Sequence, residues 1–331
     1  MEKRYDVVAL GELLVDFTQN GLSKQGNPLF EANPGGAPCN VLAMLQKLGR
    51  STAFLGKVGA DSFGEQLRQA AGEAGIELRG LRSDPAVPTT LAFVHRKPDG
   101  DRDFSFFRSP GADMMLRTDE LDDELLTDCK LFHFGTLSMT HPGIRAATQA
   151  AVLRARQAGA RISFDPNLRP PLWGSLDEAM AQIEWGLRQC DILKIADNEL
   201  AFLYPDAVPG ESGKPQDYEP AARRLLQQYP NVRLLTVSCG AEGSSAFCGE
   251  QTVCVPAFLL GGSVDTTGAG DCFCACVLHD ALEHGLERRS ADSLRAMLRF
   301  ANAAGYLLTT KKGAIRSMPT PEQIARLLAG A

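Results

Sequence analysis

Strands alternate with amphipathic helices through the middle of this sequence, and this alternation limits the fold more than any other feature. Short apolar runs read as strands and runs of helical period separate them, in the order strand 131–134, helix 142–158, strand 160–164, helix 176–188, strand 192–195, helix 223–228 and strand 233–237. Such alternation implies parallel βαβ units. The pattern therefore predicts an α/β fold with a mostly parallel central sheet, whose ligands bind beyond the carboxyl ends of the strands.

Composition narrows the class of protein. Of 331 residues, 44% are hydrophobic and 22% are charged, so the chain can bury a substantial core. The net charge of -6 argues against a nucleic-acid partner. No apolar run reaches membrane-spanning length and no signal peptide precedes the first strand, so we expect a soluble cytoplasmic protein without a membrane partner. The nine cysteines are expected to be reduced core residues rather than metal ligands.

Residues 261–276 combine a glycine loop with the start of a helix. Asp265 ends an extended segment, and Gly268-Ala269-Gly270 leads into an apolar run of helical period. The first amides of a helix lack intrahelical partners, and small side chains let an anion approach them. Asp271 would repel that anion, so it needs another role, such as accepting a proton from an attacking hydroxyl. The alternative is a simple turn with Asp271 as a helix cap.

A second glycine pair opens a helix near the amino-terminal end of the sequence. Gly35 and Gly36 precede a helix that carries Asn40, whose amide both donates and accepts hydrogen bonds and suits a polyhydroxyl ligand. Asp16 ends an apolar stretch, where a buried carboxylate is costly without partners. A loop aspartate that caps a turn is an equally good interpretation of Asp16.

Two β-rich runs between residues 88 and 108 interrupt the alternation. They are joined by Pro98-Asp99-Gly100, and this arrangement predicts a hairpin. Inserted hairpins of this kind commonly cover sites. Arg108 ends the aromatic strand of the hairpin, which favours a ligand contact over a solvated charge.

Polar residues also follow two of the predicted strands. Asp165, Asn167 and Arg169 follow the strand at 160–164, and Asp197-Asn198-Glu199 follows the next strand. Ligands of parallel sheets lie beyond the carboxyl ends of the strands, so these residues are candidates for a site. For the second group, an exposed helix start is an alternative of equal weight.

These motifs together resemble the ribokinase-like (PfkB) carbohydrate kinase family, and fructokinases in particular. The run from Asp265 to Asp271 resembles the family signature, Gly35-Gly36 with Asn40 resembles its amino-terminal element, and the segment 165–169 resembles a fructokinase segment. The resemblance extends from about residue 5 to about residue 320. It implies a three-layer α/β/α sandwich in a single domain, 1–331, with a small β-sheet lid from about 12–34 and 88–110.

The implied activity is an ATP-dependent sugar kinase, with D-fructose converted to fructose 6-phosphate as the favoured reaction. Asp271 would be the base, and the loop of Gly268, Ala269 and Gly270 would form an anion hole for the phosphoryl group. The resemblance implies these sugar-binding residues: Asp16, Gly35, Gly36, Asn40, Arg108, Asn167 and Arg169. It implies these nucleotide-binding residues: Ser238, Gly240, Gly243, Gly270, Asn302 and Gly313.

The same resemblance implies bound metal ions and pairing with a second copy of the chain. Glu199 would hold Mg²⁺ through water, although Ala196 stands where the family motif has Asn. A monovalent cation such as K⁺ would lie at the loop that includes Asp265, Thr267 and Ser317. Related lids often pair, which implies a homodimer through the lid.

Because Asp271 lies beside a helix start, we expect its pKa to be low.

Three other functions can be compared with the sequence. A 2-keto-3-deoxygluconate kinase, or another sugar or nucleoside kinase of the same family, remains open because Arg108 and Arg169 would serve an acidic substrate. A nucleotide-linked dehydrogenase requires Gly-x-Gly-x-x-Gly after the first strand. That motif is missing, because Gly11 is followed by Glu12-Leu13-Leu14, and this argues against a dehydrogenase. A non-catalytic sugar sensor is disfavoured because both Asp16 and Asp271 are present.

Overall fold

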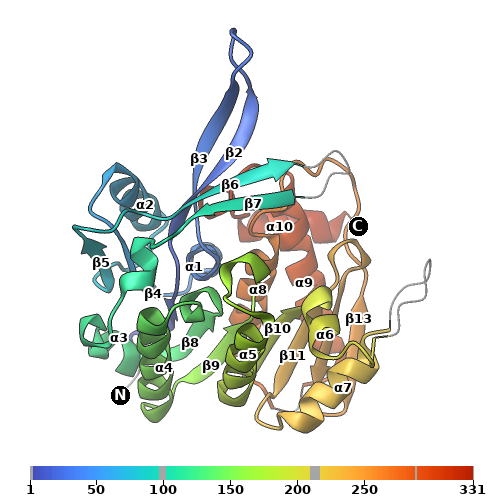
Figure 1. The fold of residues 1–331 in the computed structure, drawn as a ribbon. Coiled ribbons are helices and arrows are strands. Elements are labelled where there is room, and N and C mark those ends of the chain that lie inside the picture. Colours follow the sequence, from blue (N-terminus) through green and yellow to red (C-terminus); the bar gives the residue numbers. More distant parts are fainter. Residues whose placement is uncertain (1–2, 97–101, 209–216, 288, 331) are drawn as a thin grey trace.

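A nine-stranded sheet runs through the computed structural model, which describes residues 3–330 except 97–101, 209–216 and 288 (Figure 1). In order across the sheet, its strands are β13 (Gln251–Val255), β12 (Ser244–Cys248), β11 (Leu234–Ser238), β10 (Ile192–Ala196), β9 (Arg161–Asp165), β8 (Cys129–Gly135), β1 (Tyr5–Leu10), β4 (Thr52–Gly59) and β5 (Leu81–Asp84). Only the pairings of β12 with its two neighbours are antiparallel. The predicted mostly parallel sheet is confirmed, and the β12–β13 hairpin was not predicted.

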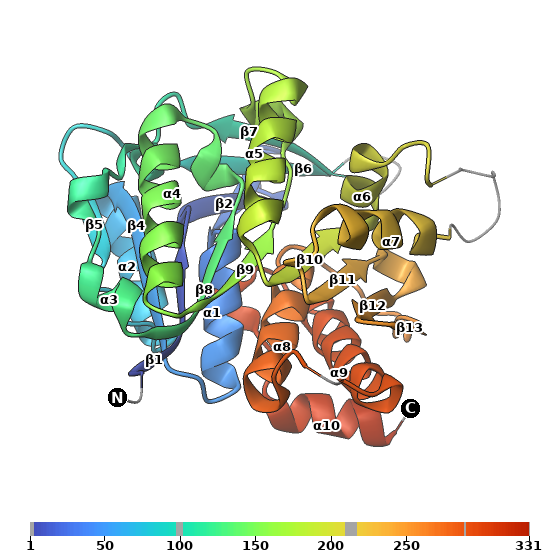
Figure 2. The same ribbon diagram turned by 90° about the horizontal axis from the view of Figure 1, so that it is seen from below.

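Helices cover both faces of this sheet (Figure 2). One face packs against α1 (Ala37–Lys47), α2 (Ser62–Glu73), α8 (Ala269–His284), α9 (Ala291–Thr309) and α10 (Pro321–Ala329). The other packs against α3 (Asp123–Thr127), α4 (Pro142–Gln157), α5 (Leu176–Gln189), α6 (Asp197–Leu203) and α7 (Glu219–Gln228). Within β1, Val7 and Ala9 join the first core while Val8 and Leu10 join the second, because successive side chains of a strand point to opposite faces. The result is the predicted three-layer sandwich.

Helix α8 lies in the middle of its layer, between α1 and α9. Its residues Cys272, Cys274 and Cys276 are buried, as expected for a helix that is apolar on nearly every side. Gly268 precedes the helix with a φ of 78°, and a Cβ there would lie 2.7 Å from the Cβ of Ala314. Only glycine fits this position, so the start of α8 is set by a residue that the sequence singled out. No helix within the described ranges is long and apolar enough to cross a bilayer.

A second, four-stranded sheet forms the lid. Its order is β3 (Pro28–Gly35), β2 (Leu14–Leu22), β6 (Leu91–Arg96) and β7 (Arg102–Phe107). The β2–β3 ribbon projects from the body, and β6 and β7 lie across the molecule beside it (Figure 1). The predicted hairpin is present as the antiparallel pair β6–β7, although its predicted turn at 98–100 lies outside the described residues. The parallel pairing of β2 with β6 joins the two parts of the lid.

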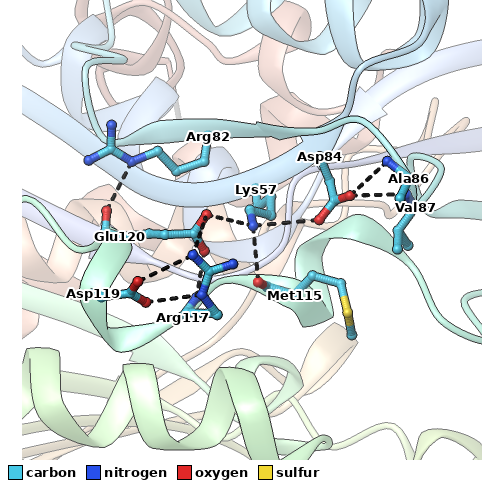
Figure 3. Close-up of polar contacts among 9 residues, drawn as sticks. All are labelled: Lys57, Arg82, Asp84, Ala86, Val87, Met115, Arg117, Asp119 and Glu120. Atoms are coloured by element: carbon cyan, nitrogen blue, oxygen red, sulfur yellow. Dashed lines mark hydrogen bonds and ion pairs between the residues drawn. The ribbon is translucent and has the colours of Figure 1, made fainter.

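A cluster of charges around the buried Lys57 fixes both chain ends of the β6–β7 hairpin (Figure 3). The Nζ of Lys57, on β4, lies 2.7 Å from Glu120 and 3.5 Å from Asp84, and it donates to the carbonyl oxygen of Met115. Asp84 in turn accepts from the backbone amides of residues 86 and 87, just before the hairpin. Residues 112–120 follow the hairpin, so Lys57 ties its entry and its exit to the central sheet.

Candidate active site

Two cavities meet beyond the carboxyl ends of the central strands. The first, which we call the lid-side cavity, has a volume of about 370 Å³ and lies between the lid, α1 and the loops after β9 and β10. The second, the α9-side cavity, has a volume of about 610 Å³ and lies between α8, α9 and the segment after β13. Ser238, Thr266 and Gly270 line both. Ligands in the two cavities would therefore face each other across the glycine loop.

Asn40 and Asp271 meet in the wall of the lid-side cavity. The Asn40 Nδ2 donates to Asp271 Oδ2 at 2.8 Å, although the two residues are 231 positions apart. Asn40 is buried, and its Oδ1 has no hydrogen-bond partner among the described residues. Because a buried amide oxygen is rarely left unsatisfied, it is suited to accept a hydrogen bond from a ligand hydroxyl. The two glycine elements found in the sequence thus belong to one site.

The Gly35-Gly36 pair is required by close packing. A Cβ on Gly35 would lie 2.3 Å from Asp16 Oδ2, and a Cβ on Gly36 would lie 2.3 Å from the carbonyl oxygen of Glu12. Gly36 also has a φ of 127°, which side-chain-bearing residues rarely adopt. Asp16, Gly36 and Asn40 all line the lid-side cavity, whereas Gly35 makes room for the Asp16 carboxylate.

Glu12 is a site residue that sequence reasoning did not identify. Its side chain is buried, lines the lid-side cavity and accepts from the Ala37 amide at 2.8 Å, so it supports the first turn of α1. Burial raises the pKa of Glu12 to about 7. The available signal was a carboxylate inside the apolar run from Tyr5 to Val15.

Asp265 fastens the glycine loop to the loop at 311–317. Its Oδ1 accepts from the amide and the hydroxyl of Thr267, at 3.0 and 2.8 Å, and its Oδ2 accepts from the amide of Gly313 at 3.1 Å. The Ser317 hydroxyl donates to the carbonyl oxygen of Lys312 within that second loop. Gly313 therefore supports the glycine loop and is not among the residues that line either cavity. A cation at Asp265, Thr267 and Ser317 stays a prediction.

The α9-side cavity has the residues expected for a nucleotide. Five of the six predicted nucleotide-binding residues line it: Ser238, Gly240, Gly243, Gly270 and Asn302. The Asn302 side chain donates to the carbonyl oxygens of Val255 and Pro256 and accepts from Ser244, so it shapes the wall. The apolar slot is completed by Phe258, Leu259 and Tyr306, and it suits a flat heterocyclic base.

Glu199 lines the lid-side cavity and joins the segments at the ends of β9 and β10. Its carboxylate accepts from the amide of Leu168 at 2.6 Å and from the amide of Ala196 at 2.8 Å. It thereby holds the segment 165–169, from which Asn167 and Arg169 line the cavity. Burial raises the pKa of Glu199. A carboxylate at this position is an oxygen donor of the kind Mg²⁺ prefers, and with two backbone hydrogen bonds already made it fits a contact through water.

Comparisons with known proteins agree with this geometry. A family model described as pfkB family carbohydrate kinase matches residues 4–321. The chain belongs to this family. It is therefore a phosphotransferase that acts on a sugar hydroxyl.

Individual relatives of this pfkB-family kinase are named as fructokinases. The "Probable fructokinase-3" of Arabidopsis thaliana is 41% identical over 95% of this chain and 88% of its own length. A crystal structure of fructokinase with bound ATP from Xylella fastidiosa has a TM-score of 0.86 at 30% identity, with 98% of each chain covered. A fructokinase double mutant from Vibrio cholerae, bound to fructose, ADP and potassium, has a TM-score of 0.83 at 26% identity, with 99% of each chain covered.

Arg108 of the pfkB-family kinase lies in the root of the lid and is not among the residues that line the lid-side cavity. Its Nε donates to Asp113 at 2.8 Å, its Nη1 donates to Thr140 at 2.8 Å, and its Nη2 donates to the carbonyl oxygen of Leu137 at 2.9 Å. All three guanidinium nitrogens are thus used inside the protein. This buried network gives Arg108 a structural role, and the predicted sugar contact stays a prediction.

The low pKa expected for Asp271 is wrong. The pKa of Asp271 is raised to about 6. Burial is the largest cause and the negative charge of Asp165 adds to it, and together they outweigh the hydrogen bond from Asn40 and the charges of Lys194 and Arg169, which lower the pKa. Removal from water thus outweighs the favourable helix start. A carboxylate with this pKa is well matched to proton transfer near neutral pH.

Lys194 is the second site residue that sequence reasoning did not identify. It lines the lid-side cavity from β10, and its Nζ lies 3.0 Å from Asp165 Oδ2. Both side chains are almost completely buried. A lysine between Leu193 and Ile195 in a buried parallel strand was the signal that could have revealed it, because such strands are usually continuous apolar runs.

Proposed function

We propose that this pfkB-family kinase is an ATP-dependent fructokinase that converts D-fructose to fructose 6-phosphate. The observation that carries the proposal is the hydrogen bond between Asn40 and Asp271, which joins a buried polar pocket to the glycine loop shared by the two cavities. The similarity to fructokinases over nearly the whole chain supports fructose as the acceptor.

In this proposal the chain positions the sugar and accepts its proton. Asp16 and the free oxygen of Asn40 receive hydrogen bonds from sugar hydroxyls, and Asp271 accepts the proton of the hydroxyl that attacks. The amides of Gly268, Ala269 and Gly270 stabilise negative charge on the transferred group. ATP supplies the phosphoryl group, and Glu199 would hold Mg²⁺ through water, where the ion would neutralise phosphate charge. Closure of the lid excludes water from the lid-side cavity.

The activity is expected to fall on the acid side of pH 6. Asp271 must be ionised to accept a proton, and its pKa is about 6. The ionised fraction is one half at that pH, is nearly complete from about one pH unit above it, and falls about tenfold for each further pH unit on the acid side. We expect kcat/KM for fructose to follow this fraction, since kcat/KM reports groups of the free enzyme. Rates measured between pH 4.5 and 8 would contradict the assignment if they showed no acid limb.

A 2-keto-3-deoxygluconate kinase is the main alternative, because Arg169 lines the lid-side cavity and is a cation suited to a carboxylate. Side-by-side assays of ADP release with ATP and each substrate separate the two functions. The proposal predicts a higher kcat/KM for fructose than for the keto acid or a nucleoside. A reversed preference would replace fructose as the substrate, and no ADP release with any sugar would favour a non-catalytic sensor.

Further features of the enzyme belong to the same proposal. We propose that two copies pair through the lid, where Leu22, Leu29, Phe30 and Phe107 are exposed large apolar side chains. A K⁺ ion at the loop of Asp265 is proposed with it, in line with the potassium named for the fructokinase from Vibrio cholerae. We also propose a cytoplasmic location, because all nine cysteines are free thiols and reduced thiols persist there.

A further inference from the structure

A buried lysine lies against the glycine loop, and the proton transfer described above does not use it. Lys194 is 6% exposed. Its ammonium nitrogen contacts Asp165, and a Cβ on Gly270 would come within 3.2 Å of the same nitrogen. Gly270 lines both cavities. The ammonium group therefore lies beside the point where a phosphoryl group would cross from one cavity to the other.

Lys194 keeps its positive charge in this position. Burial alone would lower the pKa of Lys194, but the carboxylates of Asp165 and Glu199 raise it above its ordinary value. An ammonium group has three donor hydrogens, and among the residues that the structure describes Asp165 is its hydrogen-bonding partner. The remaining hydrogens are available to an anion in the lid-side cavity, which Lys194 lines.

The carboxylates around this point make a fixed positive charge important. Asp165 contacts Lys194, and the carboxylates of Glu199 and Asp271 line the same cavity as Lys194. A phosphoryl group brings more negative charge into the same partly buried region, where like charges repel strongly. A cation fixed beside the glycine loop would stabilise that charge without having to reorganise.

We propose that Lys194 is a further catalytic residue, whose ammonium group contacts the phosphoryl group during transfer while Asp165 holds it in place. The inference rests on the proposed sugar kinase activity. In the transfer, the sugar oxygen bonds to phosphorus, the bond from phosphorus to the leaving oxygen of ADP breaks, and the hydroxyl proton goes to Asp271. Lys194 remains protonated throughout, so it acts through charge and hydrogen bonding only.

Three variants test this role by steady-state kinetics. Lys194→Met keeps an unbranched side chain of nearly the same length and removes the charge. We expect kcat to fall by about 10²-fold with KM for fructose changed by less than about threefold. Lys194→Arg should recover part of kcat. The double variant Lys194→Met with Asp165→Asn removes both charges, so it should regain the thermal stability that an unpaired Asp165 costs without regaining turnover.

Ligand binding gives a readout that does not depend on turnover. Titration calorimetry with inorganic phosphate and with fructose 6-phosphate measures the affinity of the site for a phosphoryl group. We expect Lys194→Met to weaken both by about tenfold or more, because a charge-assisted hydrogen bond is lost. Fructose itself should bind the variant as it binds the unaltered protein.

The pH profile distinguishes a charge effect from a packing effect. The following groups affect or contact Asp271: Asn40 of α1, Asp165 of β9, Arg169 of the segment after β9, Lys194 of β10 and Cys274 of α8. Lys194 is among the charges that favour the ionised form of Asp271. Its removal should therefore move the acid limb of kcat/KM to higher pH in Lys194→Met, and Lys194→Arg should move it back.

Two results would overturn the inference while leaving the sugar kinase activity in place. One is a Lys194→Met protein with unchanged kcat and phosphate affinity. The other is a double variant that regains turnover together with stability, since only the pairing of the two charges would then matter. Failure of the unaltered protein to phosphorylate any sugar would instead refute the proposed function, and the phosphate titrations would still decide whether Lys194 binds a phosphoryl group.

Discussion

Replacing Asp271 with asparagine is expected to lower kcat for fructose phosphorylation by a factor of about 10²–10⁴, the usual contribution of general base catalysis. Asparagine has nearly the same shape and keeps an oxygen that accepts from Asn40, so the fold and the cavity should persist. What it loses is the ability to accept a proton from the attacking hydroxyl. Single-turnover rates and ATP titration calorimetry would measure the two quantities, with ATP affinity expected to stay within about threefold.

Asp292→Asn is the matched control for this experiment. Asp292 is also a carboxylate in the first turn of a long helix, but its side chain is 94% exposed at the start of α9. Its replacement should leave kcat unchanged. A turnover of Asp271→Asn close to that of the control would show that another group accepts the proton.

Replacing Asp113 with alanine is expected to lower the free energy of unfolding by about 3–5 kcal/mol, because it leaves the buried Arg108 without its counter-charge. The two side chains are each 2% exposed, and Arg108 Nη2 lies 2.7 Å from Asp113 Oδ2. Asp113 also accepts from the Thr90 hydroxyl, so its loss loosens the root of β6 as well. Urea denaturation followed by circular dichroism measures the change.

Asp119→Ala serves as the comparison, since Asp119 forms an ion pair with Arg117 in the same region but its side chain is 72% exposed. Exposed ion pairs contribute little to stability, so its unfolding midpoint should match that of the unaltered protein. Equal midpoints for Asp113→Ala and Asp119→Ala would contradict the structural role given to the Arg108 network. They would also favour the predicted sugar contact as the main role of Arg108.

Sequence patterns were sufficient for the fold and for the two glycine elements. Period and turn residues are local signals, and they placed β8, α4, β9 and α5 within a few residues of their observed bounds. The glycines at 35, 36 and 268 were informative because a side chain at any of these positions would clash with neighbouring atoms. Parallel strands then bring the motifs to one edge of the sheet.

The features that were missed depend on contacts between distant parts of the chain. The pKa of Asp271 depends on burial and on Asp165, neither of which helix position reveals. Arg108 is paired with Asp113 across a turn, so its sequence position alone did not show that its donors were already used. Lys194 and Glu12 were passed over because each is a single charged residue within an apolar strand pattern.

The most direct measurement for the central claim is a crystal structure of the protein with fructose and a non-hydrolysable ATP analogue bound together. We expect fructose in the lid-side cavity, with one hydroxyl in hydrogen-bonding distance of Asp271 and another near Asn40 Oδ1. We expect the terminal phosphate at the amides of Gly268 to Gly270. A sugar bound away from Asp271, or a nucleotide whose phosphates point away from the glycine loop, would contradict it.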